Sequence, residues 1–144
     1  RVPASLAEVD LSGRKVLLAD DDMRNVFAIH TVLERAHLAV VHAQNGREAI
    51  EALERHPDVD LVLMDTMMPE MDGLAAMRVI RGMPRFARLP IVSLTAKAMK
   101  GDRESAIAAG ASDYVAKPVD PERLLDVIRR WVVPPESPAV AAVH

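Results

Sequence analysis

Cysteine is absent from this chain of 144 residues, which excludes disulfide scaffolds, thiol nucleophiles and cysteine metal sites. An excess of basic charge is absent too. The chain has 18 Lys and Arg residues against 21 Asp and Glu residues, which gives a formal net charge of −3. We therefore expect neither nucleic-acid binding nor membrane contact. Apolar runs are short, as in residues 61–64, whereas a membrane span needs roughly 18 residues.

The amino end carries no basic-then-apolar leader, so we expect a soluble, cytoplasmic protein, and the missing initial Met suggests a fragment of a longer chain. Hydrophobic residues make up 50% and charged residues 27%, which is typical of a globular domain. The length suits one domain with its own core. We expect a domain over residues 14–133, a linker or extension over 1–13 and a flexible tail over 134–144, because both ends lack periodicity.

Short apolar runs alternate about five times with amphipathic stretches, which predicts an α/β fold with a parallel sheet. We expect strands at residues 15–20, 38–43, 60–65, 90–95 and 113–116. Three helices are expected at about residues 23–36, 73–82 and 97–109. A helix between the first two starts after a cap at residue 45 and stops before residue 57, and the last helix starts after a cap at residue 120. Four residues of the last helix are predicted to face inward: Leu124, Val127, Ile128 and Trp131.

Five such βα units favour a single doubly wound, flavodoxin-like (βα)5 sandwich of three layers, with the parallel strands in the order 2-1-3-4-5. Right-handed crossovers place helices on both faces of the sheet, and the carboxyl end of every strand lies at one edge. Ligands bind at this edge, where the winding reverses between the first and third strands. The residues at the strand ends are therefore candidates for a functional site.

Acidic residues follow two of these strands. The first ends in residues 20–22, all Asp, and the third ends in Asp65. Carboxylates about 4 Å apart repel one another by a few kcal/mol per pair at an effective dielectric constant near 20, so we expect a cation among them. Oxygen ligands without His or Cys select Mg²⁺, with Mn²⁺ as the other option.

The remaining strand ends offer groups that bind phosphate. Thr95 ends the fourth strand, and Lys117 with Pro118 follows the fifth. With a metal nearby, Asp65 can act as a nucleophile toward phosphorus. Lys117 would bind a phosphoryl oxygen as a point charge, and Thr95 would donate a hydrogen bond to it.

Four segments in this order resemble a response-regulator receiver domain of the CheY-like type, over about residues 14–132. They are KVLLADDD with Asp20 and Asp21, LVLMDTMMPEMDG with Asp65, SLTAKA with Thr95, and DYVAKP with Lys117. Each segment alone is a weak signal, but all four in order at strand ends are a strong one.

The resemblance implies a role for each residue. Asp65 is the phosphorylated residue, and it binds Mg²⁺ directly together with Asp21. Asp20 assists through water, and the backbone carbonyl of Met67 completes the protein ligands. A cis bond before Pro118 would direct the preceding Lys into the site.

The resemblance also implies a switch. Phosphoryl on Asp65 draws Thr95 toward it, the ring of Tyr114 turns into the vacated space, and the face made by the fourth helix, fifth strand and fifth helix changes its affinity for a downstream protein. The phosphoryl donor would be a phosphohistidine on a histidine kinase or a phosphotransfer protein. Such a domain promotes its own phosphorylation and dephosphorylation without being a multi-turnover enzyme.

Two positions that vary in the family border the path of a hydrolytic water. They are Met67, two residues after Asp65, and Lys97, two residues after Thr95. Our hypothesis is that the apolar Met67 side chain obstructs this water and prolongs the phosphorylated state.

Three other functions compete with a phosphoacceptor domain. A phosphatase of the haloacid-dehalogenase type needs a second acid where this chain has Met67, and a flavodoxin-like FMN carrier would repel phosphate with residues 20–22. A degenerate receiver that serves only as a scaffold does not need the complete acid set. Residues 84–125 and the leader at residues 6–22 resemble receivers attached to the carboxyl side of hybrid histidine kinases, and a freestanding regulator is the alternative.

The five His residues show no metal-ligand spacing along the sequence. His30 lies on the first predicted helix of a βα unit rather than in a two-helix dimer stem, which disfavours it as a kinase phosphodonor.

Overall fold

The computed structural model describes residues 11–68, 70–96 and 100–132. Within these ranges five parallel strands form one sheet in the order β2-β1-β3-β4-β5, which confirms the predicted topology. The strands are β1 (Lys15–Ala19), β2 (Ala39–Ala43), β3 (Leu61–Asp65), β4 (Ile91–Thr95) and β5 (Asp113–Ala116).

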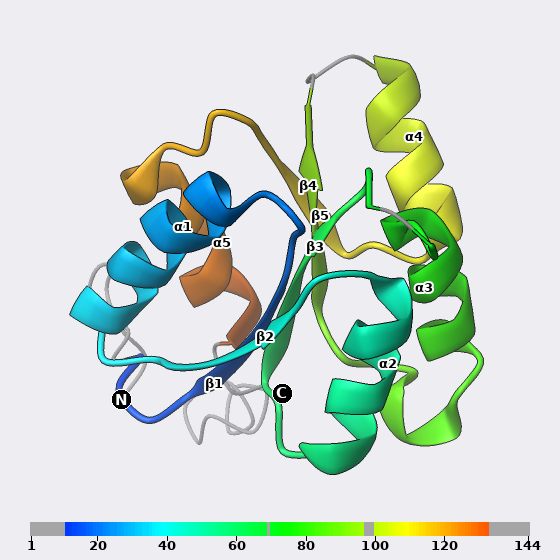
Figure 1. The fold of residues 1–144 in the computed structure, drawn as a ribbon, viewed down its shortest axis with the longest axis horizontal. Coiled ribbons are helices and arrows are strands. Elements are labelled where there is room, and N and C mark those ends of the chain that lie inside the picture. Colours follow the sequence, from blue (N-terminus) through cyan, green and yellow to red (C-terminus); the bar gives the residue numbers. More distant parts are fainter. Residues whose placement is uncertain (1–10, 69, 97–99, 133–144) are drawn as a thin grey trace, which may run out of the picture.

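Helices cover both faces of the sheet, with α1 and α5 on one face and α2, α3 and α4 on the other (Figure 1). Their bounds are α1 (Met23–Arg35), α2 (Gly46–Arg55), α3 (Gly73–Arg81), α4 (Lys100–Ala109) and α5 (Pro121–Val132). A short 3-10 turn, η2 (Pro84–Phe86), follows α3 and has no counterpart among the predicted elements. The predicted start of the fourth helix, at residues 97–99, lies outside the described ranges. None of the helices in these ranges has the length and apolar character that crossing a bilayer requires.

The core consists of two apolar clusters, one on each face of the sheet. All residues of β3 and β4 are buried, as expected for strands covered on both sides. Because side chains alternate along a strand, Val62 packs under α2 and α3 while Leu63 packs under α1 and α5. Leu11, within the stretch predicted to be an extension, is buried in the second cluster.

The prediction that Trp131 faces inward is wrong, because this residue lies at the surface, 38% exposed. The buried row of α5 has a spacing of four residues and ends on Val132 instead. The indole N–H of Trp131 donates a hydrogen bond to the carboxylate of Asp113 at 3.0 Å. An indole N–H buried in the core would need a hydrogen-bond acceptor there. At the surface, Asp113 at the start of β5 provides this acceptor.

Two glycines let the loop after β3, described at residues 66–68 and 70–72, pack closely against its neighbours. A Cβ on Gly73 would overlap the backbone oxygen of Asp65, and one on Gly46 would lie 2.7 Å from the backbone oxygen of Met71. The Gly46 N–H donates a hydrogen bond to this Met71 oxygen at 2.8 Å. The carboxyl end of the loop thus lies close to both the end of β3 and the start of α2.

We predict that Gly73→Ala lowers the free energy of unfolding by about 2–4 kcal/mol, because the new methyl group displaces the backbone at Asp65. Gly101→Ala is the matched control. Gly101 lies in α4, where an added methyl group would have no neighbouring atom within 4 Å, so alanine there should be neutral or stabilise by up to about 1 kcal/mol. Urea unfolding followed by circular dichroism measures both, and equal stability of the two variants would contradict the close-packing argument.

Candidate functional site

The acidic residues lie at the carboxyl edge of the sheet, each placed there by its own strand. Asp65 is the last residue of β3, and Asp20 directly follows β1, where its N–H donates to the backbone oxygen of Ala43 at 3.0 Å. Asp20 is fully buried and Asp65 is 3% exposed, whereas Asp21 is exposed. Two of the three carboxyl groups are therefore shielded from water.

These three carboxyl groups converge on one point. One carboxylate oxygen from each of Asp20, Asp21 and Asp65 lies within 4.8 Å of the others. Oδ1 of Asp20 accepts a hydrogen bond from the N–H of Asp22 at 2.9 Å, while its buried Oδ2 has the ammonium group of Lys117 as its charged neighbour. Asp22 itself is separate from the cluster, because its carboxylate caps α1 by accepting from the N–H of Arg24.

Among the described residues, Lys117 supplies the one ammonium group that contacts this cluster. Its Nζ lies 3.3 Å from Oδ2 of Asp20 and 3.2 Å from Oδ1 of Asp65. The backbone holds this residue in place, because its N–H donates to the Thr95 oxygen at 2.7 Å. The bond from Lys117 to Pro118 is cis, as the family resemblance implies. One ammonium among three carboxyl groups leaves a surplus of negative charge.

The surroundings shift both pKa values at the centre. Burial, with a smaller contribution from the charge of Asp20, raises the pKa of Asp65 to about 6, although the Met67 N–H and Lys117 act in the opposite direction. Burial alone would lower the pKa of Lys117, but the carboxylates of Asp65 and Asp20 outweigh it and raise that pKa. Lys117 is thus positively charged, and Asp65 is an ionisable carboxyl group near neutrality.

Thr95 adds a hydroxyl group without a partner at the same edge. It is 2% exposed, and its Oγ1 makes no hydrogen bond with any described residue. A buried polar group left in this state costs about 1–3 kcal/mol, so a ligand oxygen within reach would relieve the cost. Thr95 also lines a small pocket of about 170 Å³ that includes Thr66 and Met67, whose side chain is 73% exposed.

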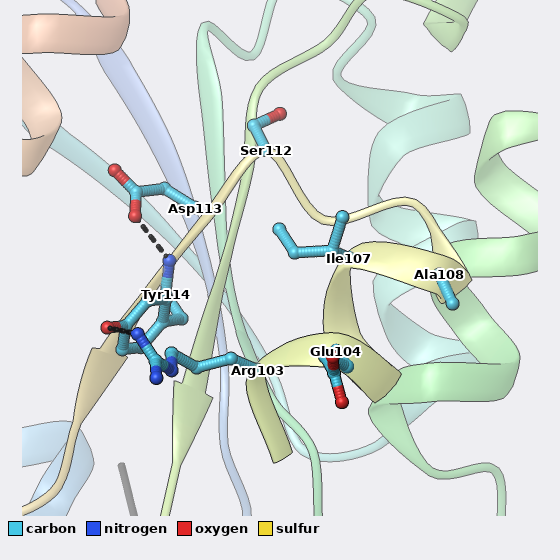
Figure 2. A pocket seen from close by; sticks show the side chains of 7 residues that line it. All are labelled: Arg103, Glu104, Ile107, Ala108, Ser112, Asp113 and Tyr114. Carbon is cyan, nitrogen blue, oxygen red and sulfur yellow. Dashed lines mark hydrogen bonds between the residues drawn. The ribbon is translucent and has the colours of Figure 1, made fainter. Parts of the chain in front are cut away.

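Tyr114 lines an open groove between α4 and β5 (Figure 2). Arg103 of α4 donates a hydrogen bond to the Tyr114 hydroxyl at 3.2 Å, and its guanidinium carbon lies 5.5 Å from the ring centroid. The groove has a volume of about 590 Å³ and is also lined by Ile107, which is 51% exposed. The ring is therefore held at the surface by a side chain of α4.

The contacts that support the loop after β3 were not predicted from the sequence. Asn45 caps α2 through its Oδ1, and its Nδ2 donates to the carboxylate of Glu70 at 3.3 Å. Glu70 adopts a left-handed backbone with a φ of 64°. No spacing in the sequence indicates a contact between residues 25 positions apart. Lys97, singled out from the sequence, and Pro69, within the segment LVLMDTMMPEMDG, lie outside the described ranges.

Comparisons with known proteins agree with this geometry. Residues 16–129 match the family model of the response regulator receiver domain. The signal transduction histidine-protein kinase BarA of Escherichia coli is 38% identical over 116 residues, which are 81% of this chain and 12% of the kinase. This chain thus spans about one eighth of the length of that relative.

Two solved structures resemble the chain in fold and sequence. One is the receiver domain of the sensor histidine kinase PA1611 from Pseudomonas aeruginosa, with magnesium coordinated in the active site cleft. It is 36% identical with a TM-score of 0.78, covering 84% of this chain and 98% of that one. The other is from the Saccharomyces cerevisiae co-crystal of the histidine phosphotransfer protein Ypd1 and the Ssk1 receiver domain. It is 26% identical with a TM-score of 0.78, covering 84% of this chain and 90% of that one.

The raised pKa of Asp65 predicts a pH dependence of stability without divalent cations. The pKa of Asp65 is about 6 in the folded state, whereas that of an ordinary Asp side chain is 3.8. Between these two pH values the folded chain carries a proton on Asp65 that the unfolded chain has lost. The contribution of the Asp65 carboxyl group to the free energy of unfolding is therefore fully present below pH 3.8 and is lost as the pH rises through 6. Asp65→Asn should therefore gain stability over the native chain across this window, on the order of 2 kcal/mol at pH 7.

Urea unfolding in EDTA at several pH values between about 4 and 7 measures this difference. Asp58→Asn is the control, because Asp58 is a surface residue paired with Lys15. A difference between the Asp65→Asn variant and the native chain that stays constant over this pH range would contradict the assignment.

Proposed function

The chain belongs to the response regulator receiver family of two-component signalling, and from this membership we propose that Asp65 accepts a phosphoryl group from a phosphohistidine. The observation that carries the proposal is the convergence of Asp20, Asp21 and Asp65 with Lys117 at one point. This arrangement combines a nucleophilic carboxylate with a cation that can bind phosphoryl oxygen.

The cluster also fits a divalent cation. Its ligands are all oxygen atoms, and its three carboxyl groups outnumber the single ammonium group of Lys117, so negative charge remains in surplus. Asp21 and Asp65 would hold Mg²⁺ or Mn²⁺ directly, Asp20 through water, and the Met67 backbone carbonyl would complete the protein ligands. When bound, the metal neutralises charge on the transferred group. The magnesium in the related PA1611 receiver supports this assignment.

In the transfer step a carboxylate oxygen of Asp65 attacks phosphorus, an O–P bond forms, the P–N bond of the phosphohistidine breaks, and the imidazole leaves with its proton. Oδ1 of Asp65 accepts from the Met67 N–H and contacts Lys117, which leaves Oδ2 as the attacking atom. Lys117 binds an oxygen of the arriving phosphoryl group. The Thr95 hydroxyl donates to another and so gains the partner that it lacks among the described residues.

Phosphorylation would be transmitted by the movement of Thr95. As this side chain moves toward the phosphoryl group, the Tyr114 ring turns inward and gives up its contact with Arg103. The groove lined by α4 and β5 then changes shape, and with it the face of α4, β5 and α5 that would bind a downstream protein.

We place the domain in a cytoplasmic hybrid histidine kinase, since BarA and similar relatives are histidine kinases of which this chain matches a part. The phosphohistidine would lie on the dimerisation domain of that kinase or on a phosphotransfer protein, as the complex of the related Ssk1 receiver with Ypd1 suggests. A freestanding regulator would carry the same chemistry. A haloacid-dehalogenase-type phosphatase is disfavoured, because Met67 occupies the position of its second acid.

The test is incubation with a small-molecule phosphodonor and Mg²⁺, followed by intact-mass measurement. We predict one phosphoryl adduct on the native chain, none on Asp65→Asn, and a normal adduct on the surface control Asp58→Asn. Chelation with EDTA should slow formation at least about a hundredfold, because carboxylates alone repel the donor. An adduct that forms on Asp65→Asn at the native rate would refute the proposal.

Met67 generates a second prediction, on the lifetime of the phosphorylated state. Its apolar side chain is exposed at the pocket beside Thr66 and Thr95. If it obstructs the hydrolytic water, Met67→Asn should speed dephosphorylation by about threefold to tenfold, because an amide can position water. Met67→Leu, which keeps the apolar bulk, should retain the native rate. Loss of the adduct followed by mass over time measures this, and an unchanged rate in Met67→Asn would overturn the hypothesis.

A further inference from the structure

Two histidines that are 12 positions apart in the sequence meet on the surface between α1 and β2. Nδ1 of His30 lies 3.0 Å from Nε2 of His42. Their rings are stacked, with centroids 4.9 Å apart and planes inclined by 23°. His30 lies on α1 and His42 on the edge strand β2, so the pair connects a helix with a strand.

The separation of the two ring nitrogens equals that of neighbouring ligands on one metal ion. Imidazole nitrogens bind Zn²⁺ at about 2.0–2.1 Å, which places two adjacent ligands roughly 2.9–3.4 Å apart. Burial and the neighbouring His30 lower the pKa of His42, so this ring is neutral at pH 7 and its lone pair is available. In the absence of metal, one N–H proton lies between these two nitrogens. When a metal ion binds, this proton moves to Nδ1 of His42 or leaves to water, so that both nitrogens present a lone pair to the ion.

Glu34 lies on the other side of the His30 ring and also bears on whether Nδ1 of His30 can bind a metal ion. Its Oε2 lies 3.6 Å from Nε2 of His30, one helical turn along α1. At this distance the carboxylate makes no hydrogen bond with His30, but its charge favours the tautomer with the proton on Nε2. This tautomer leaves the lone pair on Nδ1, the nitrogen next to His42.

We propose that His30 and His42 form a binding site for a late divalent transition-metal ion, Zn²⁺ or Cu²⁺, held by Nδ1 of His30 and Nε2 of His42. Water molecules complete the coordination, because both side chains reach the surface. Imidazole ligands select these ions over Mg²⁺, which takes oxygen ligands, so the site is chemically distinct from the cluster around Asp65. A bound ion links α1 to β2 and should stabilise the fold.

The experiment is a calorimetric titration of Zn²⁺ into untagged protein, with millimolar Mg²⁺ present to occupy the acid cluster. The native chain should bind one Zn²⁺, and His30→Gln or His42→Gln should weaken binding at least about tenfold. Glu34→Gln should weaken it less, because that carboxylate is 75% exposed. His37→Asn is the matched control and should bind normally, since Asn tolerates the φ of 65° at this position.

A spectroscopic measurement identifies the ligands directly. With one equivalent of Cu²⁺, the electron paramagnetic resonance spectrum of the native chain should show coupling to two nitrogen nuclei, and each Gln variant should lose at least one. Circular dichroism checks that the variants are folded. Unchanged Zn²⁺ affinity in both Gln variants, or a Cu²⁺ spectrum without nitrogen coupling, would overturn the inference.

The outcome is independent of the proposed function. Asp65→Asn should keep the Zn²⁺ site while losing the phosphoryl adduct. Zn²⁺ binding that disappears in Asp65→Asn but persists in His30→Gln would place the ion in the acid cluster and refute the histidine site, with no consequence for phosphorylation.

Discussion

The ion pairs of Lys117 with Asp20 and Asp65, at 3.3 Å and 3.2 Å, are the interaction on which the site depends. They join the ends of three strands, β1, β3 and β5, at the edge where the winding of the sheet reverses. Removal of the ammonium group would leave two buried carboxylates and the exposed Asp21 facing one another. The lysine makes the cluster tolerable in the fold, and the surplus negative charge leaves a place for a second cation.

The surrounding structure keeps this unfavourable arrangement in place. The acid cluster lies at the ends of β1 and β3, beside the fully buried strand β4, and the end of the following loop is held by the close approaches at Gly46 and Gly73. Thr95 remains buried without a hydrogen-bond partner among the described residues. Local costs of this kind are typical of functional sites, where a ligand later supplies the missing partner.

Much of this architecture follows from the sequence. The order of the strands follows from five βα units, and the topology brings residues such as Asp20, Asp65 and Lys117 to one edge although they are far apart in the chain. Strand ends are predictable because apolar runs stop where polar residues begin. Helix caps such as Asp22 follow from local backbone chemistry.

Contacts between side chains of separate elements cannot be predicted in this way. Helical periodicity places Trp131 in the core, but the four-residue row of α5 and an acceptor at Asp113 place it at the surface. The contact of Arg103 with Tyr114 and the pairing of His30 with His42 depend on how helices lie over the sheet. Periodicity shows which face of a helix is buried but not which residue of another element it meets.

The most direct test of the central claim is chemical trapping of the phosphorylated residue. Borohydride reduces an acyl phosphate to the alcohol, so a phosphorylated Asp becomes homoserine, which peptide mass spectrometry can locate. After phosphorylation and reduction, the account predicts homoserine at position 65, and none at positions 20, 21 or 22. Homoserine at any of those three positions, or a phosphorylated chain that yields no homoserine, would contradict it.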